Sequence, residues 1–235
     1  MNELFKRSVL QRLSADALFP GVEVFVLRED LIHPEVSGNK LRKLAGYLEE
    51  LDRGGYSGIY TAGGAYSNHI AATAAAGKLF GFQTAAIIRG DELNEQSNPT
   101  LQRAAEHGMQ LRFVDRARYR ELATSETLPR ELQVEGRWLW VPEGGQGERG
   151  EKGVAALVEN LNGDHFDSAF VALGTGTTFC GLLGTAVADK LVGVSVVRDS
   201  AMWEHVQRRA RQKGVGPEKF SLLFDRDFGG YNRFN

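Results

Sequence analysis

The stretch "SGNKLRKL" at residues 37–44 brings three cations, Lys40, Arg42 and Lys43, into the first turn of an expected helix. Small residues precede the turn, Asn39 is a plausible N-cap, and leucines at helical spacing follow. The N-terminus of a helix carries the positive end of its macrodipole, so each cation there costs about 0.3–1 kcal/mol without a nearby anion. The spacing therefore predicts that something negative lies beside this turn.

A second segment offers groups that bind an anion. In "ALGTGTTFCG", residues 172–181, two glycines free the backbone and three threonines supply hydroxyls. These five residues are Gly174, Thr175, Gly176, Thr177 and Thr178. A loop of this kind at a helix start can direct N–H groups and hydroxyls at a phosphate, which would be the missing anion. By itself the segment is equally compatible with a tight turn between a strand and a helix.

The same loop matches nucleotide-binding motifs only in part. A dinucleotide fingerprint needs a third glycine at position 179, where Phe179 stands, although Asp199 after the next expected strand could bind a ribose. A P-loop would need Gly-Lys-Ser/Thr, which does not follow here. A nucleotide-dependent oxidoreductase is therefore a disfavoured alternative.

The composition excludes several classes of protein. The 235 residues carry 28 Lys and Arg against 30 Asp and Glu, so the basic surplus typical of nucleic-acid binders is missing. Cys180 is the only cysteine, which rules out an intrachain disulfide and a multi-thiolate metal site, and the scattered histidines predict no metal. The N-terminal residues lack the apolar stretch of a signal peptide or membrane span. We expect a cytoplasmic protein with neither a membrane nor a nucleic-acid partner.

Apolar runs of strand length alternate with helical patterns along the chain. The expected strands are 22–27, 58–63, 84–90, 110–114, 137–142, 168–174 and 191–197. The expected helices are 39–53, 66–79, 98–107, 150–162, 177–189 and 200–213. This alternation predicts an α/β fold with parallel sheets, whose ligands bind beyond the carboxyl ends of the strands. Another such junction is "TAGGAYSNH" at residues 61–69.

Several of these motifs agree in order with one family. "SGNKLRKL", "GGAYSNH", "VPEGGQGERGEKG" and "GTGTTFCGLL" together resemble the 1-aminocyclopropane-1-carboxylate deaminase and D-cysteine desulfhydrase family, pyridoxal-phosphate enzymes of the tryptophan synthase β fold. The resemblance runs from about Val22 to the last residues. It implies a two-domain, three-layer αβα architecture (fold type II) with mostly parallel sheets. It also implies a large cofactor-binding domain of residues 1–43 plus 151–235 and a small domain of residues 44–150.

The resemblance implies roles for the polar residues of two motifs. Lys40 matches the lysine that bonds covalently to the cofactor aldehyde, a role suited to an amine whose pKa is lowered by burial and by neighbours such as Arg42 and Lys43. Lys43 matches the lysine that holds the cofactor phosphate. Asn68 matches the asparagine that hydrogen-bonds the oxygen on the pyridine ring. The alternatives are an ordinary exposed lysine at position 40 and a mere helix cap at "SNH".

The remaining motif residues complete the implied site. Ser67 would contact the substrate carboxylate or transfer a proton, and His69 would flank the cofactor ring. Residues 174–178 resemble the cup for the cofactor phosphate, and the turn at residues 143–145 is expected to shape the site rather than react. Cys180 is expected to be a packed small side chain. Trp138 and Trp140 alternate along a strand and are expected to face the surface or to pack on one face.

The implied chemistry acts on a small amino acid. From D-cysteine, Lys40 or Ser67 would take the α-proton and the thiol would leave, giving pyruvate, ammonia and sulfide. From 1-aminocyclopropane-1-carboxylate, which has no α-proton, a nucleophile or a proton transfer to carbon would open the ring and give 2-oxobutyrate and ammonia. The resemblance implies a homodimer and does not choose between these two substrates.

The chain ends before the last segment of the resemblance. Tyr231 in "FGGYNRFN" matches a tyrosine that faces the cofactor, but family members continue with helices, a strand and an Asp-Pro-Val-Tyr segment beside the pyridine nitrogen. We therefore expect poor turnover by these 235 residues alone. The alternative function is a shortened homologue that binds pyridoxal phosphate and catalyses weakly.

Overall fold

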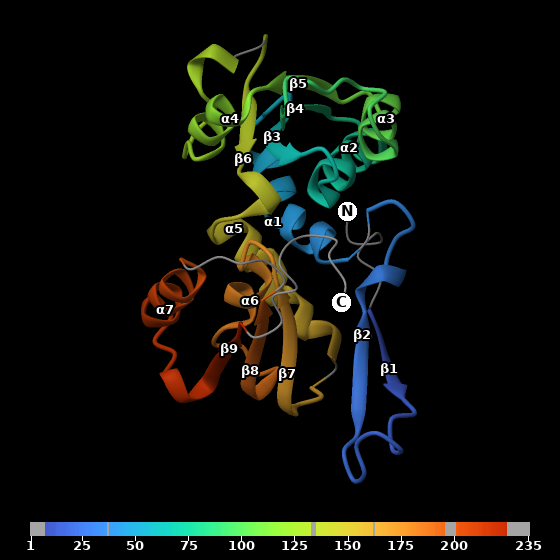
Figure 1. Cartoon of the computed structure of the whole chain (residues 1–235), viewed down its shortest axis with the longest axis vertical. Helices are drawn as coiled ribbons and strands as arrows, with labels where there is room; N and C mark the ends of the chain where they lie inside the picture. The colour runs from blue at the N-terminus through green and yellow to red at the C-terminus, as the bar shows by residue number, and fades with distance from the viewer. Residues whose placement is uncertain (1–7, 37, 133–134, 162, 196–200, 225–235) are drawn as a thin grey trace.

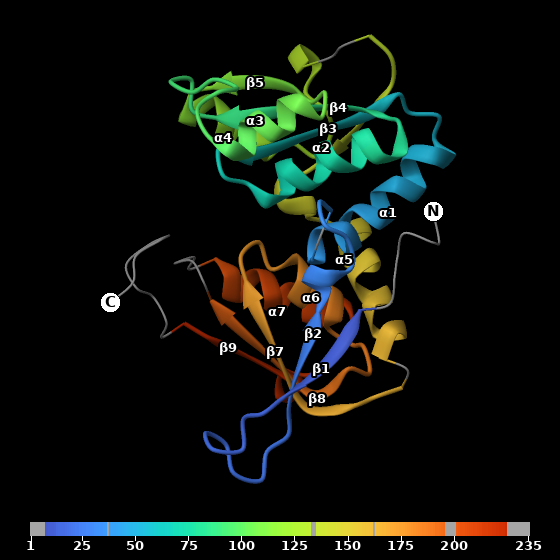
Figure 2. The ribbon, with the colours of Figure 1, turned by 90° about the vertical axis from the view of Figure 1, so that its right-hand side faces the viewer.

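Two parallel sheets organise the protein in a computed structural model that describes residues 8–36, 38–132, 135–161, 163–195 and 201–224. Helices α1 (Asn39–Arg53) and α5 (Glu148–Ala155) lie between the sheets (Figures 1 and 2). The fold class expected from the sequence, a mostly parallel α/β architecture, is confirmed.

The first sheet has four parallel strands in the order β5-β4-β3-β6. Their bounds are β3 Gly58–Gly64, β4 Gln83–Arg89, β5 Gln110–Val114 and β6 Trp138–Val141. Helices α2 (Asn68–Phe80), α3 (Pro99–Glu106) and α4 (Arg116–Ala123) pack around this sheet (Figure 1). The two central strands read as nearly continuous apolar runs because both of their faces are covered. Trp138 and Trp140 are buried and pack against Tyr60, so the packing alternative holds for them and the surface alternative is wrong.

The second sheet has three parallel strands in the order β7-β8-β9. Their bounds are β7 Phe166–Leu173, β8 Ala188–Ser195 and β9 Phe220–Leu223. Helices α6 (Thr177–Leu182) and α7 (Met202–Gln212) share one apolar core with these strands. A separate antiparallel hairpin, β1 (Val9–Leu13) and β2 (Val24–Arg28), lies beside this sheet, and Phe25 of the hairpin contacts Phe166.

Helices α1 and α5 approach each other closely because glycines face the contact. A Cβ atom at Gly46 would lie 2.2 Å from the carbonyl oxygen of Arg149, and one at Gly153 would lie 2.1 Å from the carbonyl oxygen of Arg42. Contacts this short exclude any side chain at either position. The pair therefore forms a rigid base for the first turn of α1. Among the described residues, no helix has the length and apolar content needed to cross a membrane.

Most expected elements are present within two residues of their predicted bounds. The helix expected at 150–162 is α-helical only to Ala155 and continues as the 3-10 helix η4 (Ala156–Leu161), and the strand expected at 191–197 begins three residues earlier, at Ala188. The helix expected at 177–189 ends at Leu182, because Gly184 adopts a φ of 79° and the chain then enters β8. The sequence prediction also missed β1, α4 and β9. The predicted division into residues 1–43 plus 151–235 and residues 44–150 stays a prediction.

Candidate active site

The first turn of α1 lies directly against the glycine-threonine loop of the second sheet. Gly38 precedes the helix with a φ of 67°, and Asn39 is its first residue. The side-chain amide Nδ2 of Asn39 donates a hydrogen bond of 2.7 Å to Oγ1 of Thr178. The prediction of Asn39 as N-cap is therefore wrong, because its side chain bridges to the loop and does not cap its own helix. The same bond joins the two motifs that the sequence analysis connected through an anion.

Arg42 points away from this site. Its Nε donates to Oε2 of Glu29 at 3.0 Å, and a second nitrogen, Nη2, donates to Oγ of Ser8 at 3.0 Å. The side chains of Arg42 and Glu29 are only 5% and 14% exposed, so this is a largely buried ion pair. One of the three cations thus has an anion from the protein itself. The expectation that Arg42 lowers the pKa of Lys40 is wrong, because its charge is used by Glu29.

Lys40 and Lys43 are the cations that remain in the site. Burial lowers the pKa of Lys40, and the carboxylate of Glu143 opposes that shift. Burial, together with the charge of Lys40, lowers the pKa of Lys43 to about 7, and Lys43 is only 2% exposed. A buried ammonium without a full counter-charge gives up its proton more easily, as both shifts show. An anionic ligand beside Lys43 would raise its pKa again, because it would stabilise the ammonium.

The loop at residues 174–178 has the open backbone expected of an anion cup. A Cβ atom at Gly174 would meet no heavy atom within 4 Å, and Gly176 adopts a φ of 76°. The hydroxyls of Thr175 and Thr177 lie 3.0 Å apart. Cys180 follows on α6, fully buried, and burial raises the pKa of its thiol to about 12, so it is a packed neutral side chain as expected.

The start of α2 contributes the "SNH" residues. Ser67 is the N-cap, and its hydroxyl oxygen accepts a hydrogen bond of 3.4 Å from the backbone N–H of Ile70. Asn68 is exposed in the first turn, where a ligand can reach its amide. Ser67 therefore does cap the helix, and this role leaves its hydroxyl proton free to donate.

His69 is held in one tautomer by a buried chain of hydrogen bonds. Oγ1 of Thr61 donates to the carbonyl oxygen of Val141 at 2.7 Å and lies 2.9 Å from Nε2 of His69. Since the single hydroxyl proton of Thr61 is used by Val141, Nε2 of His69 must be the donor. Nδ1 is then a bare acceptor, buried and without a partner among the described residues. Burial and the charges of Lys40 and Lys43 lower the pKa of His69 to about 3, so the ring is neutral.

The turn η3, residues Glu143–Gly145, connects these parts. A Cβ atom at Gly145 would lie 3.1 Å from Cβ of Lys43 and 3.5 Å from Cε1 of His69. One at Gly144 would lie 2.8 Å from Cγ2 of Thr175. The turn therefore touches α1, α2 and the cup, which brings the four separate motifs to one place.

Two groups in this place were not assigned a reactive role from the sequence. Glu143 was expected only to shape the site, yet its charge acts on Lys40. Tyr119 of α4 was not predicted either, although it is 3% exposed and the Glu143 carboxylate acts on its hydroxyl. Nothing in the sequence around Tyr119 marks it, because its position depends on how α4 packs against the first sheet.

Some expected residues lie outside the site or outside the described part of the chain. Tyr231, Asp199 and Ser37 fall outside the described residues. Within the described ranges, no three His, Cys, Asp or Glu side chains group as metal ligands.

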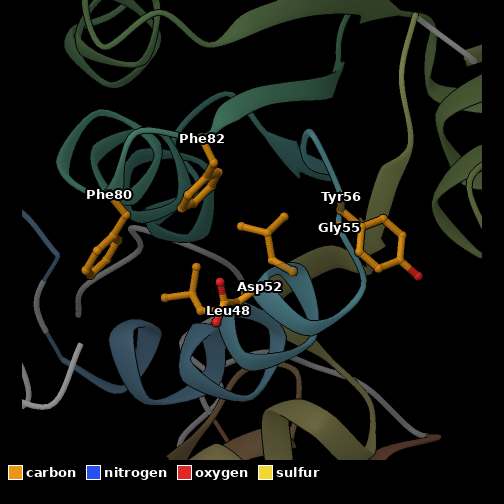
Figure 3. Close-up of a pocket in the computed structure, with 7 residues that line it drawn as sticks. Leu48, Asp52, Gly55, Tyr56, Phe80 and Phe82 are labelled. Carbon is orange, nitrogen blue, oxygen red and sulfur yellow. The ribbon is translucent and has the colours of Figure 1, made fainter.

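A separate hollow lies at the far end of α1 (Figure 3). It encloses about 340 Å³, and its walls are leucines of α1 and the rings of Tyr56, Phe80 and Phe82. Asp52 is its single acidic lining residue and lies twelve residues after Lys40, or about 18 Å along the helix. This hollow is therefore separate from the lysine site.

Comparison with known proteins identifies the family. The family described as pyridoxal-phosphate dependent enzymes matches residues 4–215. The chain belongs to this family. A Pyrococcus horikoshii protein, provisionally named 1-aminocyclopropane-1-carboxylate deaminase, is 31% identical over 227 residues, covering 91% of this chain and 69% of the relative. The Arabidopsis thaliana protein named bifunctional D-cysteine desulfhydrase/1-aminocyclopropane-1-carboxylate deaminase is 29% identical, covering 81% of this chain and 52% of the relative.

Solved structures of pyridoxal-phosphate enzymes share the fold. The crystal structure of a homologue of the aminocyclopropane deaminase superposes with a TM-score of 0.77 at 26% identity, covering 96% of this chain and 73% of the other. The family and fold-type II predictions are thus confirmed, and pyridoxal 5'-phosphate is the cofactor of this family member.

The residues of the site fit that cofactor. Its phosphate is a dianion, the cup is hydrogen-bonded to α1 through Asn39, and Lys43 of the same helix is a buried cation that lacks a full counter-charge. Its aldehyde reacts with a neutral amine. Burial lowers the pKa of Lys40, so deprotonating this amine costs less free energy than deprotonating an exposed lysine. The cofactor phosphate is therefore a suitable anion for the cations that remain beside the first turn of α1.

Proposed function

We propose that this pyridoxal-phosphate enzyme deaminates a small amino acid, either D-cysteine or 1-aminocyclopropane-1-carboxylate. The observation that carries the proposal is the hydrogen bond from Asn39 to Thr178, which joins the helix of Lys40 to the phosphate cup. The names of the relatives support the two substrates. Both reactions consume one water: D-cysteine gives pyruvate, ammonia and hydrogen sulfide, and the cyclopropane gives 2-oxobutyrate and ammonia.

The proposal gives each site residue a task. The cofactor withdraws electrons from the substrate α-carbon when bound. Lys40 would hold the cofactor by its aldehyde, and its amine would take or return a proton. Lys43 and the cup at residues 174–178 bind the phosphate, and Asn68 donates to the ring oxygen. Ser67 binds the substrate carboxylate through its free hydroxyl proton, and His69 packs as a neutral ring beside the cofactor.

Covalent binding at Lys40 is the first test. Purified protein with added pyridoxal phosphate should show a visible absorbance band, and borohydride reduction followed by mass spectrometry should locate the adduct on Lys40. The Lys40→Ala variant should lose the band, whereas Lys152→Ala, whose side chain is 78% exposed on α5, should keep it. No band in the wild type, or a band unchanged in Lys40→Ala, contradicts the proposal.

Product assays then separate the two substrates. Pyruvate released from D-cysteine and 2-oxobutyrate released from aminocyclopropane carboxylate should be measured with the same preparation. Product from either substrate, lost in Lys40→Ala, supports deamination. A protein that binds the cofactor on Lys40 and yields neither product would contradict the proposed activity and leave only cofactor binding.

The proposal extends to a cytoplasmic homodimer. The family resemblance supports the dimer, and a single cysteine, Cys180, buried in the core, is compatible with a reducing compartment. Sedimentation equilibrium of the cofactor-loaded protein tests the dimer, since a concentration-independent monomer mass would contradict it.

A further inference from the structure

Glu143 lies opposite the lysine face of α1. Lys40, Lys43 and Tyr47 follow one another at helical spacing and share that face. The Tyr47 hydroxyl donates to the carbonyl oxygen of Gln146, and Lys43 lies against Gly145. The segment after β6 thus runs in the same direction as α1, with Gly145 at the level of Lys43 and Gln146 at the level of Tyr47.

The same pairing of residues between η3 and α1 continues to the first turn of the helix. Stepping back from the Lys43–Gly145 contact brings Glu143 to the level of Lys40. The charge of Glu143 acts on Lys40 accordingly. The register and the electrostatics therefore agree on one pair.

The other charges near Lys40 do not replace Glu143. Lys43 on α1 is a second cation, and His69 on α2 is neutral. Cys180 on α6 carries a protonated thiol. The buried carboxylate of Glu151 on α5 is bound by cations of α7 and the residue after it. Glu143 is therefore the carboxylate whose charge counters Lys40 in the described part of the site.

Tyr119 supports this carboxylate from the other side. Burial, then the charge and the hydrogen-bonding of the Glu143 carboxylate, raise the pKa of Tyr119 far above its usual value, and its buried hydroxyl has no other partner among the described residues. The phenol therefore stays protonated and is an O–H donor beside an acceptor. The guanidinium of Arg89 lies 5.7 Å from the centre of the Tyr119 ring and closes the outer side.

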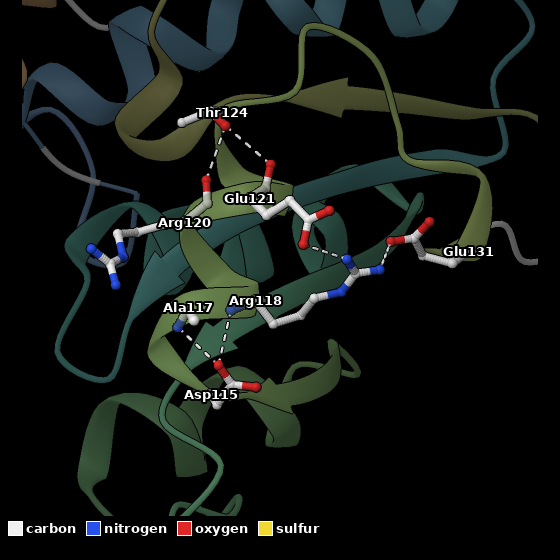
Figure 4. A network of polar contacts seen from close by, with 7 residues as sticks. All are labelled: Asp115, Ala117, Arg118, Arg120, Glu121, Thr124 and Glu131. Carbon is white, nitrogen blue, oxygen red and sulfur yellow. Dashed lines mark hydrogen bonds and ion pairs between the residues drawn. The ribbon is translucent and has the colours of Figure 1, made fainter.

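Helix α4, which carries Tyr119, is fixed by a side-chain cap and by ion pairs of its surface residues (Figure 4). Asp115 caps its first turn by accepting from the N–H groups of Ala117 and Arg118 at 2.8 and 2.9 Å. The Arg118 side chain pairs with Glu121 and Glu131. Tyr119 thus comes from an anchored helix and not from a loose loop.

We propose that Glu143 is the protein's own counter-charge for Lys40, stabilising its ammonium by electrostatic attraction from a carboxylate at the same level of α1, with the Tyr119 phenol beside that carboxylate. This deepens the proposed function and rests on it for the catalytic consequence. When the neutral amine of Lys40 takes the substrate proton, it becomes an ammonium, and Glu143 stabilises the charge that forms. Glu143 and Tyr119 are thereby positioning residues that act through Lys40.

The test titrates Lys40 in the cofactor-free protein. Trace labelling with acetic anhydride across about pH 6 to 10, read by mass spectrometry, gives the midpoint at which Lys40 becomes a free amine. Glu143→Gln should lower this midpoint by about one pH unit, equivalent to roughly tenfold faster labelling below the midpoint, because the stabilising anion is gone. Tyr119→Phe should lower it by less. Glu148→Gln, whose side chain is 86% exposed on α5, is the matched control and should leave the midpoint unchanged.

An unchanged midpoint in Glu143→Gln, or the same shift in Glu148→Gln, overturns the inference. If circular dichroism shows that Glu143→Gln does not fold, Glu143→Asp and Tyr119→Phe decide in its place, and wild-type midpoints in both overturn it. In the holoenzyme, Glu143→Gln should reduce kcat about tenfold with little change in KM and should shift the pH profile of kcat. If Glu143→Gln shifts the labelling midpoint of Lys40 but the wild-type chain forms no adduct with the cofactor, the proposed function is contradicted and the inference about Glu143 still holds.

Discussion

Two buried charge clusters in this protein are balanced in opposite ways. On α5, Glu151 is 5% exposed and accepts two hydrogen bonds from Arg209, at 2.9 and 2.8 Å, with the ammonium of Lys213 at 3.2 Å. On α1, Lys40 is half-buried and Lys43 is buried, the charge of Glu143 acts on Lys40, and burial lowers the pKa of both lysines.

The difference separates a structural cluster from a ligand site. A buried carboxylate with charged partners on every side needs nothing from outside, and its role is to tie α5 to α7. Two adjacent buried cations destabilise the empty protein until an anion arrives. Binding of the anionic ligand should therefore raise the free energy of unfolding, as expected for a preformed cofactor site.

Removing Lys40 should have the largest effect on function. Lys40→Ala should abolish the covalent bond to the cofactor and lower kcat by at least about a thousandfold, because one amine both binds the aldehyde and transfers protons. The free energy of unfolding of the cofactor-free protein should change little or increase, since a half-buried cation is removed. Steady-state kinetics and denaturant titration measure the two effects. A large loss of stability would place Lys40 with the structural cluster.

Lys43 should make the empty protein more stable as the pH rises. Its folded pKa is about 7, below the value near 10.4 of an unfolded lysine, so the penalty for its burial is full below about pH 7 and vanishes above about pH 10. The free energy of unfolding should rise over that window by roughly 3–5 kcal/mol relative to Lys43→Met. Urea titrations of both proteins at several pH values measure the difference, which cancels contributions from other groups. Parallel curves for the two proteins would contradict the unbalanced burial of the Lys43 charge at this site.

Breaking the structural cluster should cost stability at every pH near neutrality. Glu151→Ala leaves Arg209 and Lys213 without their carboxylate and should lower the free energy of unfolding by about 3 kcal/mol. Cofactor absorbance should persist at temperatures where the variant remains folded. The control is Glu218→Ala, an exposed carboxylate near β9, which should have almost no effect. Loss of the cofactor band in a folded Glu151→Ala protein would show that the two clusters are not separate.

The sequence indicated the segments of the candidate site better than the side-chain contacts between them. The segments that carry Lys40, Lys43, Ser67, Asn68 and residues 174–178 stand out in the sequence because glycine-rich strand ends and helix starts leave a local pattern, while the roles of these residues come from the family resemblance and stay predictions. The bounds of α1 were also predicted correctly, since its leucines repeat at helical spacing and Gly54 follows its last residue.

Long-range partners left no such pattern. The pairing of Arg42 with Glu29 and the bridge from Asn39 to Thr178 depend on how distant segments meet, over 13 and 139 residues of chain. The extension of helix 177–189 failed for a local reason, since Gly184 interrupts an otherwise helical apolar pattern. Helix α4 was missed because its charged sequence has few apolar residues, although Asp115 is a recognisable N-cap.

Removing the hydrogen bond between α1 and the cup should have the smallest effect among these variants. Asn39→Ala removes the 2.7 Å hydrogen bond to Thr178, worth about 0.5–1.5 kcal/mol, and should weaken cofactor binding roughly three- to tenfold. Asn94→Ala is the matched control, because Asn94 is an exposed residue whose side chain accepts from a nearby backbone N–H. Fluorescence titration with pyridoxal phosphate measures the affinity of each variant. Equal affinities in both would show that the phosphate cup is positioned by α5 and α6 without help from α1, and the unbalanced cations would then act on the ligand by charge alone.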